Sequence, residues 1–549
     1  MSAQPTAVVA ELRDSPASNE LRQVDSTKEV RGSLTPEIVI ALCGPIGSPL
    51  HEVATQISSA LVPFDYKAEQ IRLSSIISLN AGDVGKIIFP KPRLKQINSL
   101  IEAGDALREK YGHDILAKVA IAKISADRAQ GYGEFDDKAA ESGVAESKKI
   151  NNQRICHIIN SIKNESELEL LRLVYGNALV AIGVFSPLDI RRHNLQNAAQ
   201  EAMSSDDIDT LIDTDSGEEF AHGQSVRDTF PRCDFFLRVD QPVSGSTESD
   251  AAGQIAKKLR RLFGLIFRTS ISTPLPEETA MYAAASAARN SACLSRQVGA
   301  SVTSRSGELL AVGWNDVPQA GGGLYGKPSL EATSAALDPS ADRRCFAGEN
   351  PRCRNDEEKL GIAGKVADLL IKEGLVAKDH RDRILTAISK DSRVKDLIEF
   401  SRAVHAEMHA ILGAGRIAGD RLVGGMIFVT TYPCHSCARH IVAAGITEIH
   451  YIEPYRKSMA TKLHSDSLTE GVGPDMRVKL IQFDGVAPRR FIEIFEAGKR
   501  KDRGVLDLSL RDAAIPSTRV SLKAIPRLEE AVIAELDNKA LKYVPLAST

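Results

Sequence analysis

Two short segments of this chain carry the side chains of one metal site, so the fold must bring them together. Residues 405–407 read His-Ala-Glu, and residues 433–437 read Pro-Cys-His-Ser-Cys. One imidazole and two thiolates suit zinc, and a catalytic zinc takes three protein ligands and keeps its fourth position for water. We therefore predict a zinc site with His405, Cys434 and Cys437 as ligands.

Glu407 stands beside the imidazole and is not needed as a ligand. In zinc deaminases a metal held by one His and two Cys activates water, while a glutamate that is no ligand moves protons. The proton leaves the water, reaches a ring nitrogen and then departs with ammonia, which requires a group that both accepts and donates it. The pattern therefore predicts hydrolytic deamination of a pyrimidine or purine ring, with Glu407 as the catalytic acid and base.

The residues around both segments favour two helix starts. Between residues 402 and 416, apolar side chains recur at helical spacing, which places the His-Ala-Glu segment in the opening part of a helix. Residues 424–431 read as a short buried strand, and the proline after it suits the beginning of a second helix. The two cysteines would share one face of its first turn, where the helix dipole favours thiolates.

Two other interpretations of these residues stay open. A structural zinc site closes with four protein ligands, and His435 and His440 are nearby candidates for the fourth. Alternatively, the thiols of Cys434 and Cys437 could form a redox pair, although that interpretation leaves the His-Ala-Glu segment unexplained.

The composition is that of an ordinary globular chain. At 549 residues it exceeds one usual hydrophobic core, so we expect two domains plus tails. A formal net charge of -3 gives no general attraction to nucleic acid. Neither a signal peptide nor an apolar run of about 18 residues is present, so we expect a cytoplasmic protein without a membrane segment. Eight cysteines in such a length fit reduced thiols better than a disulfide framework.

The pattern along the chain divides it into four parts. Residues 1–35 read as a flexible tail, and residues 36–270 alternate apolar runs with helical stretches. Residues 275–500 carry the metal signature and contain an insertion at 319–400. Residues 501–549 are a C-terminal extension with an expected helix over 527–543.

The first of these domains opens with a strand that leads into a glycine-containing loop. Residues 37–43 are an apolar run, and residues 44–51 read Gly-Pro-Ile-Gly-Ser-Pro-Leu-His. A working phosphate loop needs Gly, Lys and Ser or Thr at its last three positions, where this chain has Pro, Leu and His. Gly44, Gly47 and Ser48 are therefore candidate nucleotide contacts in a degenerate loop.

Three later apolar runs, at 155–159, 178–184 and 234–239, suggest a parallel sheet with crossover helices. With residues 186–192, this part resembles nucleoside and nucleotide kinases. The resemblance implies a P-loop kinase-like domain, and an active kinase, a nucleotide-sensing or assembly domain that binds a regulatory nucleotide, and a structural relic all stay open. The basic amphipathic helix at 251–268 is expected to pack on this sheet, with an RNA or phosphate contact as the alternative.

Several motifs around the metal signature occur in a familiar order. A helix at 281–291 precedes Arg-Gln-Val-Gly-Ala at 296–300 and Gly-Trp-Asn-x-x-Pro ending at Pro318, with the two metal segments after them. Together they resemble deoxycytidylate deaminases across residues 275–490. The resemblance implies a cytidine-deaminase-like three-layer α/β/α fold, a deoxycytidine nucleotide substrate, and contact of Asn315 with the nucleotide sugar.

Together, the two domains resemble bacterial anti-phage deoxycytidine nucleotide deaminases. The resemblance implies conversion of dCTP, and often dCMP, to deoxyuridine nucleotides, which depletes the dCTP pool during phage infection. It also implies restraint by an inhibitory small RNA in some members, and we expect a homo-oligomer. An RNA or tRNA base deaminase and a non-catalytic nucleotide- or RNA-binding regulator are the alternatives.

The chain departs from the deoxycytidylate deaminase pattern in two places. His409 stands where the family commonly has Asn, and 86 residues separate Pro318 from His405. Insertions of that length are often lids or interfaces. Within it, Cys345 and Cys353 are either two free thiols or, with a nearby His, part of a second zinc site. Residues 455–457 either border the base or phosphate pocket or form a solvated loop.

Overall fold

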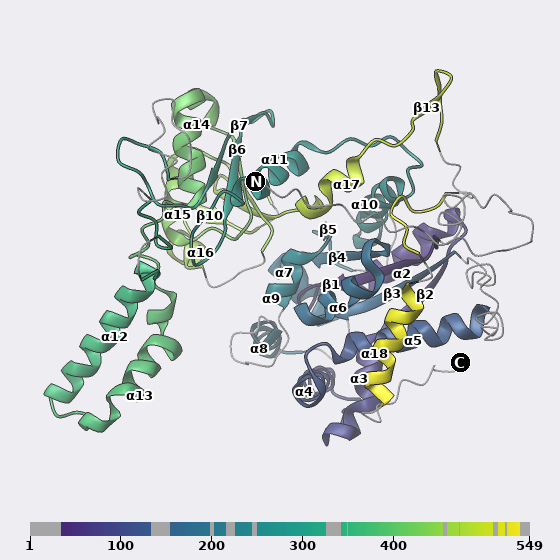
Figure 1. Ribbon diagram of the computed structural model, residues 1–549, viewed down its shortest axis with the longest axis horizontal. Coiled ribbons are helices and arrows are strands. Elements are labelled where there is room, and N and C mark those ends of the chain that lie inside the picture. The colour runs from purple at the N-terminus through teal and green to yellow at the C-terminus, as the bar shows by residue number, and fades with distance from the viewer. Residues whose placement is uncertain are drawn as a thin grey trace, which may run out of the picture.

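The computed structural model (Figure 1) describes most of the chain. The described residues are 34–132, 154–197, 203–215, 226–243, 250–325, 342–347, 350–453, 458–471, 473–508, 514–521 and 524–537. The tail expected at 1–35 lies outside them except for its last two residues. Those two contact a later segment: Leu34 forms a bridge with Ser521, and the Thr35 N–H donates to the Val520 carbonyl at 2.9 Å.

The first sheet has five parallel strands, which follow the predicted apolar runs except at one edge. In chain order they are β1 (Ile38–Cys43), β2 (Lys67–Arg72), β3 (Ile155–Ile162), β4 (Leu179–Phe185) and β5 (Phe235–Arg238). In space their order is β5-β4-β1-β3-β2. Buried side chains line both faces of the central strand β1, as a parallel sheet covered on both sides requires.

Helices cover both faces of this sheet (Figure 1). One face packs against α2 (Leu50–Leu61) and α10 (Ala251–Ile266), and the other against α5 (Ile115–Tyr132), α6 (Glu165–Tyr175) and α18 (Ile525–Asp537). Further helices are α3 (Leu73–Asn80), α4 (Arg93–Tyr111), α7 (Leu188–Asn197), α8 (Ser205–Asp215) and α9 (Val226–Thr229). The packing predicted for the basic helix at 251–268 is confirmed, since α10 buries its apolar face.

The second sheet is mixed and carries the metal signature. Its strands are β6 (Gly299–Thr303), β7 (Leu309–Trp314), β8 (Met426–Val429), β9 (Glu448–Tyr451), β10 (Leu468–Thr469) and β11 (Val478–Gln482). They lie in the order β10-β11-β9-β8-β6-β7, with β8 to β11 parallel and β6 antiparallel to both of its neighbours.

Two glycines let helices approach this second sheet from opposite sides. A Cβ on Gly299 would lie 1.9 Å from the Ala284 carbonyl of α11 (Pro276–Ala288), and one on Gly313 would lie 2.4 Å from the Ala406 carbonyl of α14 (Ala406–Leu422). Gly313 pairs with Ala300, the next residue after Gly299, so the two glycines face opposite sides. This region therefore has the expected three layers, with α15 (His435–Ala443) beside α14.

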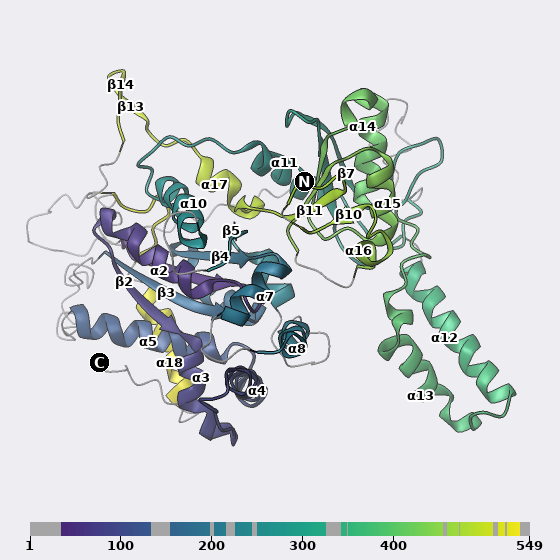
Figure 2. The same ribbon diagram turned by 180° about the vertical axis from the view of Figure 1, so that it is seen from behind.

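The insertion forms a helical arm that projects from the second sheet (Figures 1 and 2). Its two main helices are α12 (Arg354–Lys372) and α13 (Arg381–Thr386), which pack against each other.

After the second sheet, the chain returns to the first one. Strand β12 (Gly485–Val486) pairs antiparallel with β5, and α18 packs on α5. The change of sheet therefore falls near residue 484, earlier than the boundary expected at 500. The helix expected at 527–543 begins at Ile525, and residues 538–549 lie outside the described part.

The two crossings between the sheets meet at one buried carboxylate, that of Glu278. It accepts a hydrogen bond from the Leu275 N–H, where the chain enters the second sheet region, and another from the Val486 N–H, where it leaves, both at 2.8 Å. Arg261 of α10 pairs with the same carboxylate at 2.6 Å. Glu278 therefore ties both crossings to the helix that covers the first sheet.

None of the helices in the described ranges combines the length and the apolar character that crossing a membrane requires.

His157 on β3 gives the first sheet a pH-dependent stability. It is fully buried, neither ring nitrogen has a hydrogen-bond partner among the described residues, and burial lowers its pKa to about 3. Because the unfolded value is near 6.5, the neutral ring stabilises the fold above pH 6.5, and this contribution is lost as the pH falls toward 3. We expect the loss of this contribution to lower the free energy of unfolding by about 1 kcal/mol at pH 5.5.

Substitution of His157 by leucine should remove this loss. When the pH falls from 7.5 to 5.5, the free energy of unfolding of His157→Leu should decrease by about 1 kcal/mol less than that of the wild type. Urea unfolding followed by far-UV circular dichroism measures both decreases. The exposed His380→Leu serves as the control. Equal pH dependence of His157→Leu and wild type would show that the buried ring does not act in this way.

Candidate metal centre

Two helix N-termini deliver the three predicted metal ligands. His405 is the N-cap residue of α14 and follows Val404, which pairs with Asp316 beyond the end of β7. Cys434 is the N-cap residue of α15, and its sulfur accepts a hydrogen bond from the Cys437 N–H at 3.4 Å. Because α15 follows β8, an interior strand, the thiols lie just beyond the carboxyl end of that strand.

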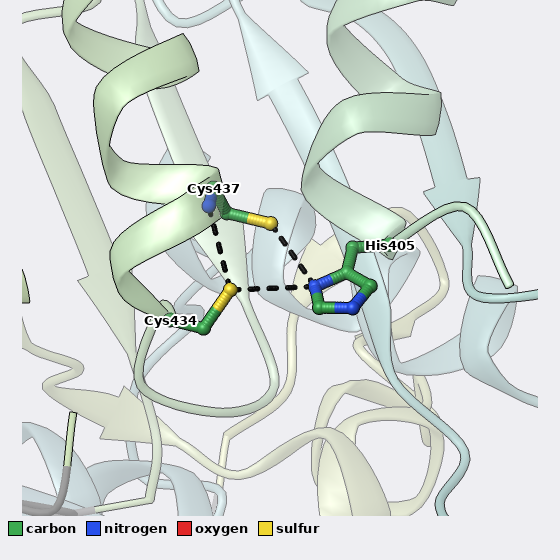
Figure 3. Close-up of side chains that lie close together, drawn as sticks. All are labelled: His405, Cys434 and Cys437. Atoms are coloured by element: carbon green, nitrogen blue, oxygen red, sulfur yellow. Dashed lines mark hydrogen bonds between the residues drawn. The ribbon is translucent and has the colours of Figure 1, made fainter. Parts of the chain in front are cut away.

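The three ligand atoms converge on one point (Figure 3). His405 Nδ1 lies 3.4 Å from Cys434 Sγ and 3.3 Å from Cys437 Sγ, and all three atoms lie within 4.8 Å of one another. Tetrahedral zinc with ordinary bond lengths would separate nitrogen and sulfur by about 3.6 Å. The donor set therefore fits zinc in both chemistry and spacing.

A fourth protein ligand does not join this group within the described residues. The His435 Nε2 lies 3.9 Å from a carboxylate oxygen of Glu399, and the His440 Nδ1 lies 2.7 Å from the Ser436 carbonyl. Both histidines thus have other neighbours. A centre with three protein ligands leaves one position for water, as a catalytic zinc site requires.

Glu407 lies on the first turn of α14 and is 4% exposed. Burial, followed by the charge of Cys434, raises the pKa of its carboxyl group. This direction of shift strengthens the carboxylate as a proton acceptor, which suits the role of a catalytic acid and base.

Hydrogen bonds among the three ligand side chains change the pKa values of two of them. A hydrogen bond from Cys437, followed by one from His405, lowers the pKa of the Cys434 thiol to about 4, and the hydrogen bond with Cys434 raises the pKa of His405 to about 9. A thiolate is the form of cysteine that binds zinc, so this arrangement prepares Cys434 as a ligand.

Asn315 has a structural task at the end of β7. Its side-chain oxygen accepts a hydrogen bond from the Val298 N–H at 2.7 Å, and its amide nitrogen donates to the Arg296 carbonyl at 2.8 Å. Asn315 is 8% exposed, and the amide keeps one further N–H for another partner. Its contact with a nucleotide sugar stays a prediction, and its hold on residues 296–298 was not foreseen.

His409 also lies against this strand end. The Trp314 N–H donates to the His409 Nδ1 at 3.1 Å, and the two rings meet edge to face with centroids 4.7 Å apart. The departure from the family's Asn therefore places a packed histidine next to Asn315. In the sequence, the one indication that His409 lies near the metal centre is its spacing, one helical turn after His405.

The candidate phosphate loop is held from outside by three side chains. Lys163 donates to the Gly44 carbonyl, Arg191 to that of Ile46 and Asn194 to that of Gly47, at 3.0, 2.6 and 3.0 Å. Ser48 Oγ has no hydrogen-bond partner among the described residues. The roles of Gly44, Gly47 and Ser48 in nucleotide binding stay predictions.

Cys345 and Cys353 line a hollow beside the segment that leads to His405. The Cys353 Sγ lies 3.5 Å from the Ser295 Oγ, and both cysteines are free thiols. No second group of three metal ligands gathers within the ranges that the structure describes. Residues 455–457, for which a border of the base or phosphate pocket and a solvated loop both stay open, lie outside those ranges.

Known proteins match the part of the chain that holds this centre. Residues 276–453 match the family model of the cytidine and deoxycytidylate deaminase zinc-binding region. The deoxycytidylate deaminases of Enterobacteria phages T2 and T4 are each 28% identical over 170 residues, 31% of this chain and 76% and 74% of theirs. ComE operon protein 2 of Bacillus subtilis (strain 168) is 36% identical over 84 residues, 15% of this chain and 41% of that protein.

Solved structures of a dCMP deaminase from the cyanophage S-TIM5, in apo form and in complex with dCMP and dUMP, are 16% and 18% identical to this chain. They cover 39% of it and 100% and 99% of their own chains, with TM-scores of 0.21 and 0.22.

The C-terminal part of the chain is therefore a zinc-binding deaminase domain. Within that class it is a deaminase domain of the cytidine and deoxycytidylate type. The family match begins at residue 276, so the first sheet apart from β12 precedes the matched region.

Proposed function

We propose that this protein hydrolyses the exocyclic amine of deoxycytidine nucleotides, dCMP and dCTP, to give deoxyuridine nucleotides and ammonia. The observation that carries the proposal is the three-ligand centre of His405, Cys434 and Cys437 with the buried Glu407 two residues after the first ligand. The phage T2 and T4 relatives, both named deoxycytidylate deaminases, support a deoxycytidine nucleotide as the substrate.

The residues divide the chemistry between them. His405, Cys434 and Cys437 would hold the zinc, which when bound supplies Lewis acidity that makes water a nucleophile near neutral pH. Glu407 takes a proton from the attacking water and gives it to N3 of the ring. It then takes the proton of the hydroxyl group now on C4 and passes it to the amine, so that the C4–N bond breaks as the C4 carbonyl forms and ammonia leaves.

The proposal extends to the whole chain. Depletion of dCTP during phage infection, a cytoplasmic location, homo-oligomers and restraint by a small RNA follow the family resemblance. For the first sheet we propose a degenerate kinase-like domain that binds a regulatory nucleotide. Its support is the parallel sheet with a glycine loop at the carboxyl end of its central strand, where open α/β sheets bind ligands.

The test is product analysis by mass spectrometry. Purified, zinc-loaded protein is incubated with a mixture of dCMP, dCTP, CTP and deoxycytidine and, in a separate reaction, with RNA, and uracil products and ammonia are quantified in both. We expect dUMP or dUTP with an equal amount of ammonia. Products from CTP alone, or from cytosines in RNA and not from free nucleotides, would replace this proposal with a different substrate. Absence of all products with stoichiometric zinc bound would favour a non-catalytic regulator.

A further inference from the structure

A buried carboxylate joins the two sheet regions close to the metal centre. Glu453 lies two residues after the end of β9, and its side chain is 6% exposed. One oxygen lies 3.5 Å from the Arg227 Nε of α9, and the other pairs with the Arg296 guanidinium. Arg227 belongs to the first sheet region and Arg296 to the second, so one carboxylate holds a cation from each.

Arg296 belongs to a backbone loop, residues 296–298, that contacts Asn315 at the end of β7. Its carbonyl accepts from Asn315, and two residues later the Val298 N–H donates to the same amide. The Gly299 N–H then donates to the Thr430 Oγ1 at 3.1 Å, four residues before Cys434. The position of this loop therefore affects both Asn315 and the segment that leads into the thiol ligands.

Glu453 is the most buried of the three side chains in this contact. The Arg227 and Arg296 side chains are 34% and 49% exposed, whereas the carboxylate between them is almost inaccessible. A buried charge is costly unless it is paired, so Glu453 holds its place through these two cations. If α9 shifted, Glu453 would lose one cation and its hold on Arg296 would change.

We infer that Glu453 is a positioning residue through which α9 of the first sheet region sets the geometry of loop 296–298 beside the metal centre. The regulatory contact between the two regions therefore has a defined chemistry, one carboxylate shared by two guanidinium groups. Its effect on turnover rests on the proposed function, whereas its effect on the loop does not.

The test removes Arg227, the cation that the first sheet region contributes to this contact. In the full-length protein, Arg227→Gln should speed hydrogen exchange of residues 296–298 about three-fold, the size expected for one partly exposed ion pair. The KM for dCMP should rise by a similar factor, with kcat and zinc content unchanged. Arg232→Gln is the matched control, because this exposed arginine pairs with Glu165 within the first sheet region.

The outcomes separate the two proposals. Faster exchange at 296–298 in Arg227→Gln and not in Arg232→Gln supports the inference, even if the wild type deaminates no cytidine nucleotide. Unchanged exchange in Arg227→Gln overturns it, whatever the activity. Glu453→Gln, if it folds, should show the same exchange pattern with a larger change, because it releases Arg227 and Arg296 together.

Discussion

Glu407→Gln should lower kcat for dCMP by about 10² to 10⁴-fold, the range that a positioned acid and base contributes. Glutamine keeps the shape of the side chain but has no carboxyl proton to accept or release. Since Glu407 is not among the three converging metal ligands, zinc content should stay at the wild-type value. Steady-state kinetics and metal analysis of the same preparation measure both quantities.

The matched control is Glu399→Gln, which removes an exposed carboxylate 3.9 Å from the His435 ring near the same centre. We expect it to change kcat less than about five-fold, because an exposed charge near a site contributes about 1 kcal/mol or less. A wild-type kcat in Glu407→Gln would show that another group moves the proton. A loss of zinc in that variant would make Glu407 a ligand.

Arg128→Met should destabilise the first sheet region by about 3 to 5 kcal/mol, the cost of breaking a buried ion pair by removing one partner. Arg128 lies 2.9 Å from the Glu37 carboxylate and also pairs with Glu529 of α18. The three side chains are at most 3% exposed. Without the guanidinium, two buried carboxylates would face each other. Native-state hydrogen exchange of β1 and α5 measures the change.

Two comparisons show whether charge is the cause. Burial raises the pKa of Glu529, which reflects the cost of its buried charge. Adding Glu37→Gln and Glu529→Gln to Arg128→Met removes both buried carboxylates and should restore part of the loss. Arg192→Met, which breaks an exposed pair with Asp209, should cost about 1 kcal/mol or less. An equal cost for Arg192→Met and Arg128→Met would contradict the argument from burial.

The metal centre could be predicted because its signals are local. The types and spacing of His405, Cys434 and Cys437 are set by zinc coordination, and the flanking residues marked the two helix starts that the structure contains. The strands of the first sheet were readable where both faces are buried, as in β1 and β4. In each case, one stretch of sequence carries the whole signal.

The features that were missed depend on contacts between distant residues. Strand β2 has the polar sequence Lys-Ala-Glu-Gln-Ile-Arg, because an edge strand needs no continuous apolar run. The two residues of β12 carry no strand signal, and their place is decided by pairing with β5. Likewise, the contacts of Asn315 with 296–298 and of Glu453 with two arginines join residues that no pattern in the sequence connects.

The meeting of both chain crossings at Glu278 has a mechanical consequence. A body attached by a single connector can swivel freely about it, whereas two connectors bound to one point resist twisting and permit bending. The deaminase region is attached in this second way, because both of its crossings bond to Glu278. A displacement of α10 would therefore reach both crossings together through Arg261 and Glu278.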